Sequence, residues 1–306
     1  MPGSRDKSFM YTLPLPGLNQ RWRENRTTYR PAGEVIKRSE YEVERIPTDV
    51  EARSFCTRHH YLGASYPVAV ERMGLYRRGS LVGVAIFSVP TNYDELNGVV
   101  LPPSGGQLAE SFSRLGYTPK RALDLGRLVL LDEVPGNAES HFVSRCFDLL
   151  RARGTQAVIA FSDPTPRYTR MPDGSTELIR RGHCGSVYQS LSAVYAGRAT
   201  ARTLRVFEDY TVLRARTLQK IRKGEKGWRG AASLLQNHGA DAPPDERVAR
   251  IEWLNYWVAR LTKPERHPGN FKYAFALDRR LRRFMVPSFP YPKLIDAPPN
   301  DVPLAA

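Results

Sequence analysis

The sequence predicts a mixed α/β fold, because a strand hairpin precedes a strand–helix–strand unit. Residues 68–76 (VAVERMGLY) and 81–89 (LVGVAIFSV) are apolar runs joined by a short Arg-Gly turn, a pattern typical of a β-hairpin. Residues 123–131 and 156–162 are two further strand patterns, separated by a helical pattern at 141–154. That order implies parallel pairing through a right-handed crossover. The hairpin and the parallel pair together predict a mixed sheet.

The elements around this centre follow from local patterns. Residues 1–45 are rich in Pro, Arg and Asn and have no periodic apolar segment, so they predict an irregular arm. A helix is expected over 49–60 with Asp49 as its N-cap. A long loop is expected over 91–122, and a helix over 186–196. In that helix Tyr188 and Tyr195, seven residues apart, share a face and are expected to pack.

The C-terminal part of the sequence is strongly basic. Between Arg214 and Arg229 there are seven basic residues and one acid, Glu225, a net charge of 7 − 1 = +6. A helix is expected over 247–261 and a strand over 271–277. The sequence thus predicts an arm at 1–45, a catalytic domain at 46–215, and a basic, mostly helical extension for DNA binding at 216–306.

Composition limits the class of protein. The 306 residues carry 46 Lys and Arg against 31 Asp and Glu, a net charge of +15, which favours a polyanion such as nucleic acid. The three cysteines, Cys56, Cys146 and Cys184, form no disulfide framework, so a reducing compartment is expected. No apolar run reaches the roughly 18 residues that cross a bilayer, and the N-terminus lacks a secretory pattern. We therefore expect a cytoplasmic protein with no membrane association.

The turn between the strand at 123–131 and the following helix is a candidate phosphate site. Residues 134–140 (VPGNAES) would point backbone N–H groups and a helix dipole at a ligand beyond the strand. Gly136 and Asn137 form the turn, Ser140 adds a hydroxyl donor, and Arg127 adds a fixed charge. The alternative is an ordinary strand–helix turn with Asn137 as N-cap, since the chain has no Walker or GxGxxG motif.

Two further positions are candidates for catalysis. Asp163 follows the strand at 156–162, at the edge where open α/β sheets usually place their sites, although an Asp before Pro also caps turns. His59, His60 and Tyr61 end the first helix. Because adjacent residues do not share a helical face, at most one of the two histidines points into a given site. Either histidine alone could equally be a hydrogen-bonded surface residue.

Together these motifs resemble a known family. The stretches RHHYLGASYP, LGRLVLLDEVPGNAESHF, VIAFSDP and GHCGSVYQSLSAVYAG are similar to the Mom family of phage DNA-modification proteins, a branch of the GNAT acyltransferase fold. The resemblance covers roughly residues 50–215. The chain departs from it by an inserted loop at 164–182, and it lacks the acetyltransferase glycine signature.

The resemblance implies transfer to the exocyclic amine of adenine in double-stranded DNA. The product would be a carbamoylmethyl adduct that protects DNA from restriction enzymes. The donor would be acetyl-CoA or a related coenzyme A compound, held by Arg127, Gly136, Asn137 and Ser140 with Tyr188 nearby. The resemblance assigns catalysis to Asp163, His60, Tyr61 and Tyr188, and iron binding to His60 (or His59), Tyr61 and Asp163. Imidazole, carboxylate and phenolate are all reasonable iron ligands.

The basic segment supplies a candidate DNA contact. If it is helical, Arg216, Lys220, Lys223 and Lys226 form one cationic face, with Arg222 beside it and Trp228 available to stack or wedge. The target base must also leave the helix stack, and aromatic rings are expected to receive it. The candidate rings are Tyr61, Tyr66 and Tyr93.

Two alternatives remain beside this reading. One is a conventional GNAT N-acyltransferase for a protein or small-molecule amine, which would have no use for the basic segment. The other is a non-catalytic DNA-binding protein on a GNAT scaffold, which would not need Arg127, Ser140 and Asp163 together. The sequence leaves open whether the protein binds iron and whether it forms a homodimer.

Overall fold

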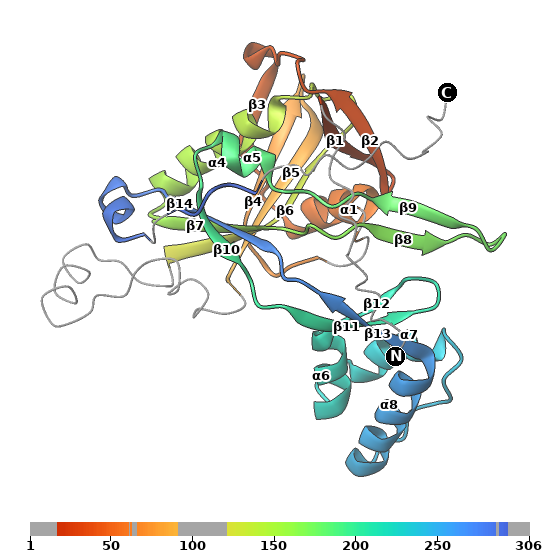
Figure 1. Ribbon diagram of the computed structural model, residues 1–306. Coiled ribbons are helices and arrows are strands. Elements are labelled where there is room, and N and C mark those ends of the chain that lie inside the picture. The colour runs from red at the N-terminus through yellow and green to blue at the C-terminus, as the bar shows by residue number, and fades with distance from the viewer. Residues whose placement is uncertain (1–16, 61, 63–65, 91–120, 286–287, 293–306) are drawn as a thin grey trace, which may run out of the picture. The chain divides into compact units, whose positions relative to one another are not determined.

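The computed structural model describes residues 17–60, 62, 66–90, 121–285 and 288–292 (Figure 1). They belong to two compact units. The first unit takes residues 1–166, 180–199 and 270–306, and the second takes 167–179 and 200–269. Among the described residues, no helix is long and apolar enough to span a membrane. Tyr61 and Tyr93 and most of the loop expected at 91–122 lie outside the described residues.

The first unit is built on a seven-stranded sheet with the order β10-β14-β7-β6-β5-β4-β3. β6 and β7 pair in parallel and every other neighbouring pair is antiparallel, so the predicted mixed α/β class is confirmed. The strands are β3 (Tyr41–Arg45), β4 (Ala69–Arg77), β5 (Ser80–Ser88), β6 (Ala122–Leu130), β7 (Ala157–Ser162), β10 (Val194–Arg198) and β14 (Phe271–Ala276).

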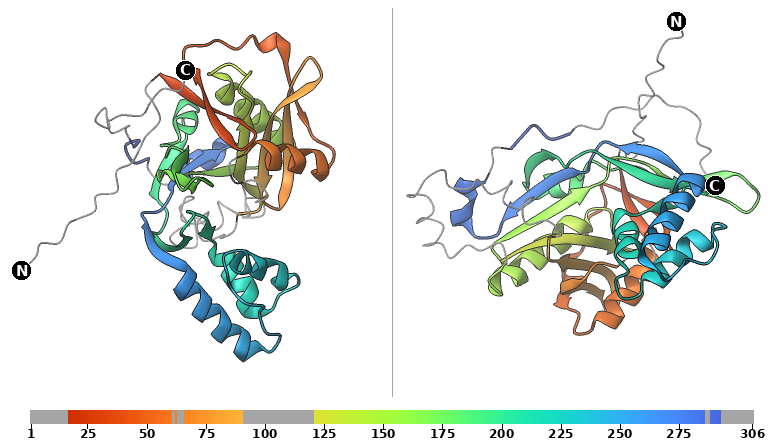
Figure 2. Two further views of the ribbon diagram at one scale, coloured as in Figure 1. Left: turned by 90° about the vertical axis from the view of Figure 1, so that its right-hand side faces the viewer. Right: turned by 90° about the horizontal axis from the view of Figure 1, so that it is seen from below.

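Helices cover both faces of this sheet (Figure 2). α1 (Asp49–His59) packs on one face, and α4 (Ala138–Ala152) packs on the other with the short α5 (Ser186–Ser190). Successive side chains of β5 point to opposite faces of the sheet and so contribute to two separate hydrophobic cores. Ile86 packs in the core on the α1 side, and Phe87 packs in the core on the α4 side. Asp49 is the first residue of α1 rather than its cap, which is Thr48.

The predicted hairpin and strand–helix–strand unit are both present. β4 and β5 pair up to Arg77 and Ser80, and the turn between them places Arg78 at φ +50° and Gly79 at φ +78°. Two consecutive positive φ values are characteristic of the type I′ turns that suit the twist of a hairpin. The β6–α4–β7 unit follows as the sequence predicted.

The expectation of an irregular arm over residues 1–45 was wrong for its described part. β1 (Leu18–Arg23) and β2 (Arg26–Pro31) form an antiparallel hairpin, and the 3-10 turn η1 (Arg38–Glu40) leads into the edge strand β3. The sequence pattern did not predict β1, because this strand buries Arg21 beside Trp22. It therefore lacks the alternation of apolar and polar residues that is typical of a half-buried strand.

The helix expected over 186–196 was also wrong beyond its first turn. α5 ends at Ser190, Ser192 adopts a positive φ of +57°, and Tyr195 lies in β10. Tyr188 and Tyr195 nevertheless pack together through a shared neighbour, since each ring lies 5.3 Å from the ring of Tyr273.

The predicted boundary at 215/216 does not separate the units. β14 comes from the expected extension, yet it lies inside the main sheet between β10 and β7. A 3-10 turn, η3 (Arg279–Phe284), follows it. The second unit contains α6 (Ala215–Lys223), α7 (Trp228–Gln236), α8 (Arg247–Leu261), the sheet of β11 (Arg202–Phe207), β12 (Val212–Leu213) and β13 (Thr262–His267), and the hairpin β8 (Arg167–Arg170)–β9 (Thr176–Arg180).

Candidate active site

The turn that begins α4 is covered by the chain's own N-terminal segment. The N–H of Gly136 donates to Oε2 of Glu34 over 2.8 Å, and the side-chain oxygen of Asn137 accepts from the N–H of Ile36 over 2.9 Å. A Cβ at Gly136 would overlap the carbonyl of Pro31, so this close approach requires glycine. The turn before α4 therefore holds a carboxylate of the same chain, and the phosphate site expected there stays a prediction.

The Glu34 carboxylate is held as an anion by its neighbours. Nε of Arg30 donates to it over 2.9 Å, and the pKa of Glu34 is lowered first by this hydrogen bond and then by the Gly136 N–H. Asn137 is the N-cap residue of α4, as the alternative reading expected, but its side chain bonds Ile36 rather than the helix. Ser140 donates its hydroxyl to the carbonyl of Asn137 over 3.3 Å.

Arg21 fixes the same turn from within the protein. Its side chain is fully buried, and its Nε donates to the carbonyl of Val134 over 3.0 Å. Its terminal nitrogens donate to the carbonyl of Pro135 and to the carboxylate of Glu139, with 3.0 Å from Nη2 to Oε2. One guanidinium thus joins β1, the turn and the first helical turn of α4.

Arg127 lies on the other face of the sheet from α4. The register of β5 and β6 shifts so that Phe87 opposes Leu125 and Ile86 opposes Arg127, which leaves Gly126 as a bulge. Arg127 therefore shares the α1 side with Ile86, and its charge acts on the thiol of Cys56 in α1. Ser140 belongs to the helix on the opposite face, so the predicted donor residues are divided between the two sides of β6.

The strands β6 and β7 separate toward their carboxyl ends. Their parallel ladder joins Ala122–Leu125 to Ala157–Ala160 and ends there, although β6 runs on to Leu130 and β7 to Ser162. The backbone groups of β6 beyond Leu125 on this side are consequently not taken up by the β7 ladder. The bulge at Gly126 begins where the ladder ends, and Asp163 directly follows β7.

Asp163 lies in a closed turn at this end of the sheet. It is 9% exposed, and its Oδ1 accepts from the N–H of Thr165 over 3.0 Å and from its hydroxyl over 2.5 Å. Its carbonyl accepts from the N–H of His183 over 3.0 Å. Gly182 packs so tightly on Pro164 that a Cβ would overlap the Pro164 carbonyl. Asp163 therefore caps this turn through its side chain. The hydrogen bond to its backbone carbonyl places His183 beside this end of β7.

Tyr188 belongs to an aromatic network beneath that segment. It is 5% exposed and packs on Tyr273 of β14, whose hydroxyl donates to the carbonyl of Cys184. Gln189 donates to the Cys184 carbonyl over 3.0 Å and to the Tyr273 hydroxyl over 3.1 Å, and burial raises the pKa of Tyr273. Tyr273, Gln189 and His183 were missed from the sequence, and the GHCGSVYQ motif was the signal for two of them.

The two histidines at the end of α1 are both buried on the α1 side. Nδ1 of His60 accepts from the N–H of Leu62 over 3.2 Å, and its ring lies 5.5 Å from that of Trp22. Nδ1 of His59 accepts from the N–H of Glu24 over 3.3 Å, and burial lowers the pKa of His59. Neither is a plain surface histidine.

The donor set for iron is incomplete within the described part of the chain. His60 and Asp163 are suitable nitrogen and oxygen ligands, whereas the third predicted ligand, Tyr61, lies outside the described residues. The described residues contain no group of three or more His, Cys, Asp and Glu side chains that could hold a metal ion.

Comparison with known proteins identifies the family. The sequence model of the Mom protein family matches residues 40–293. The chain belongs to the Mom family. No curated protein matches it.

Three of the solved structures similar to this Mom family member are N-acetyltransferases. An N-acetyltransferase from Staphylococcus aureus Mu50 is 11% identical, with 56% of this chain and 93% of that chain covered, at a TM-score of 0.30. An agmatine N-acetyltransferase is 13% identical, with 77% of this chain and 99% of that chain covered, at a TM-score of 0.33. A protein described as an arylalkylamine N-acetyltransferase from the yellow fever mosquito is 10% identical, with 90% of this chain and 100% of that chain covered, at a TM-score of 0.34. At such scores these likenesses carry no argument about activity.

One of the three rings expected to receive a base has a covered face. The guanidinium of Arg53 lies 4.6 Å from the ring centre of Tyr66, and burial together with the nearby Asp49 carboxylate raises the pKa of this tyrosine. Tyr66 is thus part of the packing at the start of α1. Tyr61 and Tyr93 lie outside the described residues and stay predictions.

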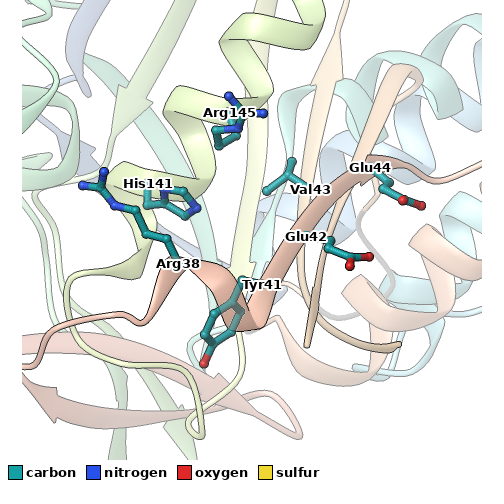
Figure 3. A pocket seen from close by; sticks show the side chains of 7 residues that line it. All are labelled: Arg38, Tyr41, Glu42, Val43, Glu44, His141 and Arg145. Atoms are coloured by element: carbon teal, nitrogen blue, oxygen red, sulfur yellow. The ribbon is translucent and has the colours of Figure 1, made fainter. Parts of the chain in front are cut away.

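A charged pocket of about 410 Å³ lies elsewhere, between β3 and α4 (Figure 3). Arg38, His141 and Arg145 lie on one side of it, and Glu42 and Glu44 lie on the other. Burial, together with both arginines, lowers the pKa of His141. None of the predicted site residues is among those that line this pocket.

In the second unit, the basic segment is helical as predicted but shorter. α6 ends at Lys223, so Lys226 lies in the following turn, and Arg216 is paired with Glu225 over 2.9 Å. Three residues in the second half of α6, which we name the α6 cations, have no ion pair recorded among the described residues: Lys220, Arg222 and Lys223.

The expectation that Trp228 can stack on or wedge into DNA was wrong. Trp228 is 8% exposed and begins α7 inside the core of the second unit. The guanidinium of Arg250 lies 4.5 Å from its ring centre, and that of Arg229 lies 4.9 Å away. The glycines around it, which suggested a loose segment, instead form a tight turn between two helices.

Proposed function

We propose that the protein is a DNA-modifying transferase. It converts the exocyclic amine of adenine to a carbamoylmethyl adduct that protects the DNA from restriction, and a coenzyme A-type compound supplies the two carbons of the adduct. The observation that carries the proposal is the match of the Mom family across residues 40–293, which spans the sheet of the first unit and the cationic helices of the second.

The reaction needs a base, because the lone pair of the adenine amine is delocalised and the amine is a poor nucleophile. Asp163 follows β7 where β6 and β7 part, and we assign it the role of accepting the amine proton. Thr165 holds one carboxylate oxygen, which fixes the orientation of the group. His60 is the second candidate for proton transfer. Tyr188 is a positioning residue, since it packs beneath the segment that reaches Asp163 through His183.

The donor fits the carboxyl end of β6. The amide groups of a pantetheine arm can pair with an extended strand edge, and the ladder between β6 and β7 ends at Leu125. The diphosphate fits the backbone N–H groups in the first turn of α4, beside the Ser140 hydroxyl. Glu34 accepts from the N–H of Gly136 in the turn just before this helix, so its carboxylate competes with the diphosphate.

Duplex DNA fits the charge of the second unit. Its basic segment carries a net charge of +6, and the α6 cations have no recorded ion pair among the described residues. Contacts of this kind add affinity for any duplex sequence, without selecting bases.

The test is nucleoside mass spectrometry of plasmid DNA from cells that express the protein. We expect a carbamoylmethyl adduct of deoxyadenosine in the wild type and none with Asp163→Ala or His60→Ala. Asp173→Ala is the matched control, because Asp173 closes the same kind of turn on Ser175, with 2.8 Å to its N–H and 2.6 Å to its hydroxyl. An unmodified adenine pool in cells that contain folded wild-type protein would contradict the proposal.

A further inference from the structure

The helices α6 and α7 form a rigid pair joined by a tight turn. Four residues connect them, and the first and last, Gly224 and Gly227, have φ values of +66° and +77°. Ile221 and Trp228 bury a common core between the helices. Arg250 of α8 locks this core, since its Nε donates to the carbonyl of Ile221 over 3.0 Å and its guanidinium covers Trp228.

We propose that this pair docks on duplex DNA as a helix-turn-helix, with α7 entering the major groove and the α6 cations on the phosphates. The inference rests on the proposed function, because it takes DNA as the partner. In such units two helices are joined by a turn of three or four residues, the first helix contacts the backbone, and the second meets base edges.

The charges agree with this orientation. Arg222 and Lys223 end α6 and Lys226 lies in the turn, and all three are exposed with no ion pair recorded among the described residues. Like charges three or four residues apart repel one another unless an anion lies between them. A phosphate backbone that crosses the end of α6 supplies such anions.

The outward face of α7 suits entry into a groove. At 100° per residue, the buried residues Trp228, Ala232 and Leu235 share one side of the helix. The side around Gly230 has no acidic residue, and its one large apolar residue, Leu234, is partly buried against the core of the second unit. Its other members are Gly230, Ser233 and Asn237, and Arg229, which is paired with Asp245, lies at its edge.

Gly230 is the most informative position on that face. Glycine is less favourable than alanine inside a helix, yet a Cβ at Gly230 would meet no atom within 4 Å. Packing within the described chain therefore does not require glycine there. The absence of a side chain lets a partner approach the helix backbone closely. Ser233 and Asn237 lie on the same face, and hydroxyl and amide groups are donors and acceptors that read base edges in the major groove.

The experiment measures binding of the full chain to a short, mixed-sequence DNA duplex at constant salt. Gly230→Leu should weaken binding by roughly tenfold or more, because its side chain separates α7 from the bases. Thermal unfolding should show no loss of stability, since the new side chain meets open space. Ala259→Leu, at an exposed position of α8, is the matched control and should bind like the wild type.

The second measurement is methylation of guanine N7, which lies in the major groove. We expect the wild type to protect N7 atoms in the bound duplex. If the wild type binds duplex DNA, but Gly230→Leu binds equally well and N7 remains reactive, the groove assignment is overturned and the proposed function stands. If the wild type does not bind duplex DNA at all, the proposed function itself fails and this inference fails with it.

Discussion

Replacing Arg21 by methionine tests the buried link that holds the start of α4. The change removes the donors to the carbonyls of Val134 and Pro135 and leaves the largely buried carboxylate of Glu139 without its cation. Breaking one partner of a buried ion pair costs about 3–5 kcal/mol. At roughly 2 °C per kcal/mol for a chain of this size, the melting temperature of the first unit should fall by about 6–10 °C.

The assay is thermal unfolding followed by circular dichroism, with two comparison variants. Arg21→Met combined with Glu139→Leu should recover much of the lost stability, because no buried charge then remains unpaired. Arg23→Met should change stability by less than about 1 kcal/mol, since its pair with Asp132 is exposed. Unchanged melting of Arg21→Met, or a double variant as unstable as the single one, would refute the reasoning.

Three further predictions concern the donor, the DNA and the thiols. Ser140→Ala should weaken coenzyme A binding by roughly ten- to a hundredfold in calorimetry. Glu34→Gln should strengthen it, because a competing carboxylate charge is lost; equal affinity would place the diphosphate elsewhere. Neutralising the three α6 cations should lower the slope of log K against log salt by roughly three units, at about 0.9 per phosphate contact. Burial raises the pKa of Cys56 to about 12, so a disulfide reagent at pH 8 should label this thiol in the unfolded chain and not in the folded one.

Local patterns in the sequence predicted the centre of the fold. The hairpin, the strand–helix–strand unit and the long C-terminal helix each have a hydrophobic period that identifies them. Two other elements conflict with their local pattern. β1 buries the charged Arg21, whose partners lie more than a hundred residues away along the chain. The segment after α5 has a helical apolar spacing, and the positive φ of Ser192 ends it.

The candidate site was predictable in its residue types but less so in its arrangement. The sequence placed Asp163 at the end of a strand and glycine at the start of α4, and both positions are confirmed. It did not predict Glu34 at Gly136 or Tyr273 beside Tyr188, because both contacts join segments far apart in the chain. The burial of Trp228 was missed for the same reason, since Arg250, which covers it, belongs to another helix.

The position of β14 has a consequence for how the protein is made. This strand is synthesised after the whole of the second unit, yet it lies between β10 and β7 in the interior of the sheet. Until residue 276 has left the ribosome, β7 and β10 each present an unpaired edge, and such edges recruit other chains. The second unit can fold early, whereas the sheet must wait for a strand of high sequence separation, which slows folding. Premature termination between residue 269, where the second unit ends, and β14 would therefore yield a complete second unit beside an open, aggregation-prone sheet.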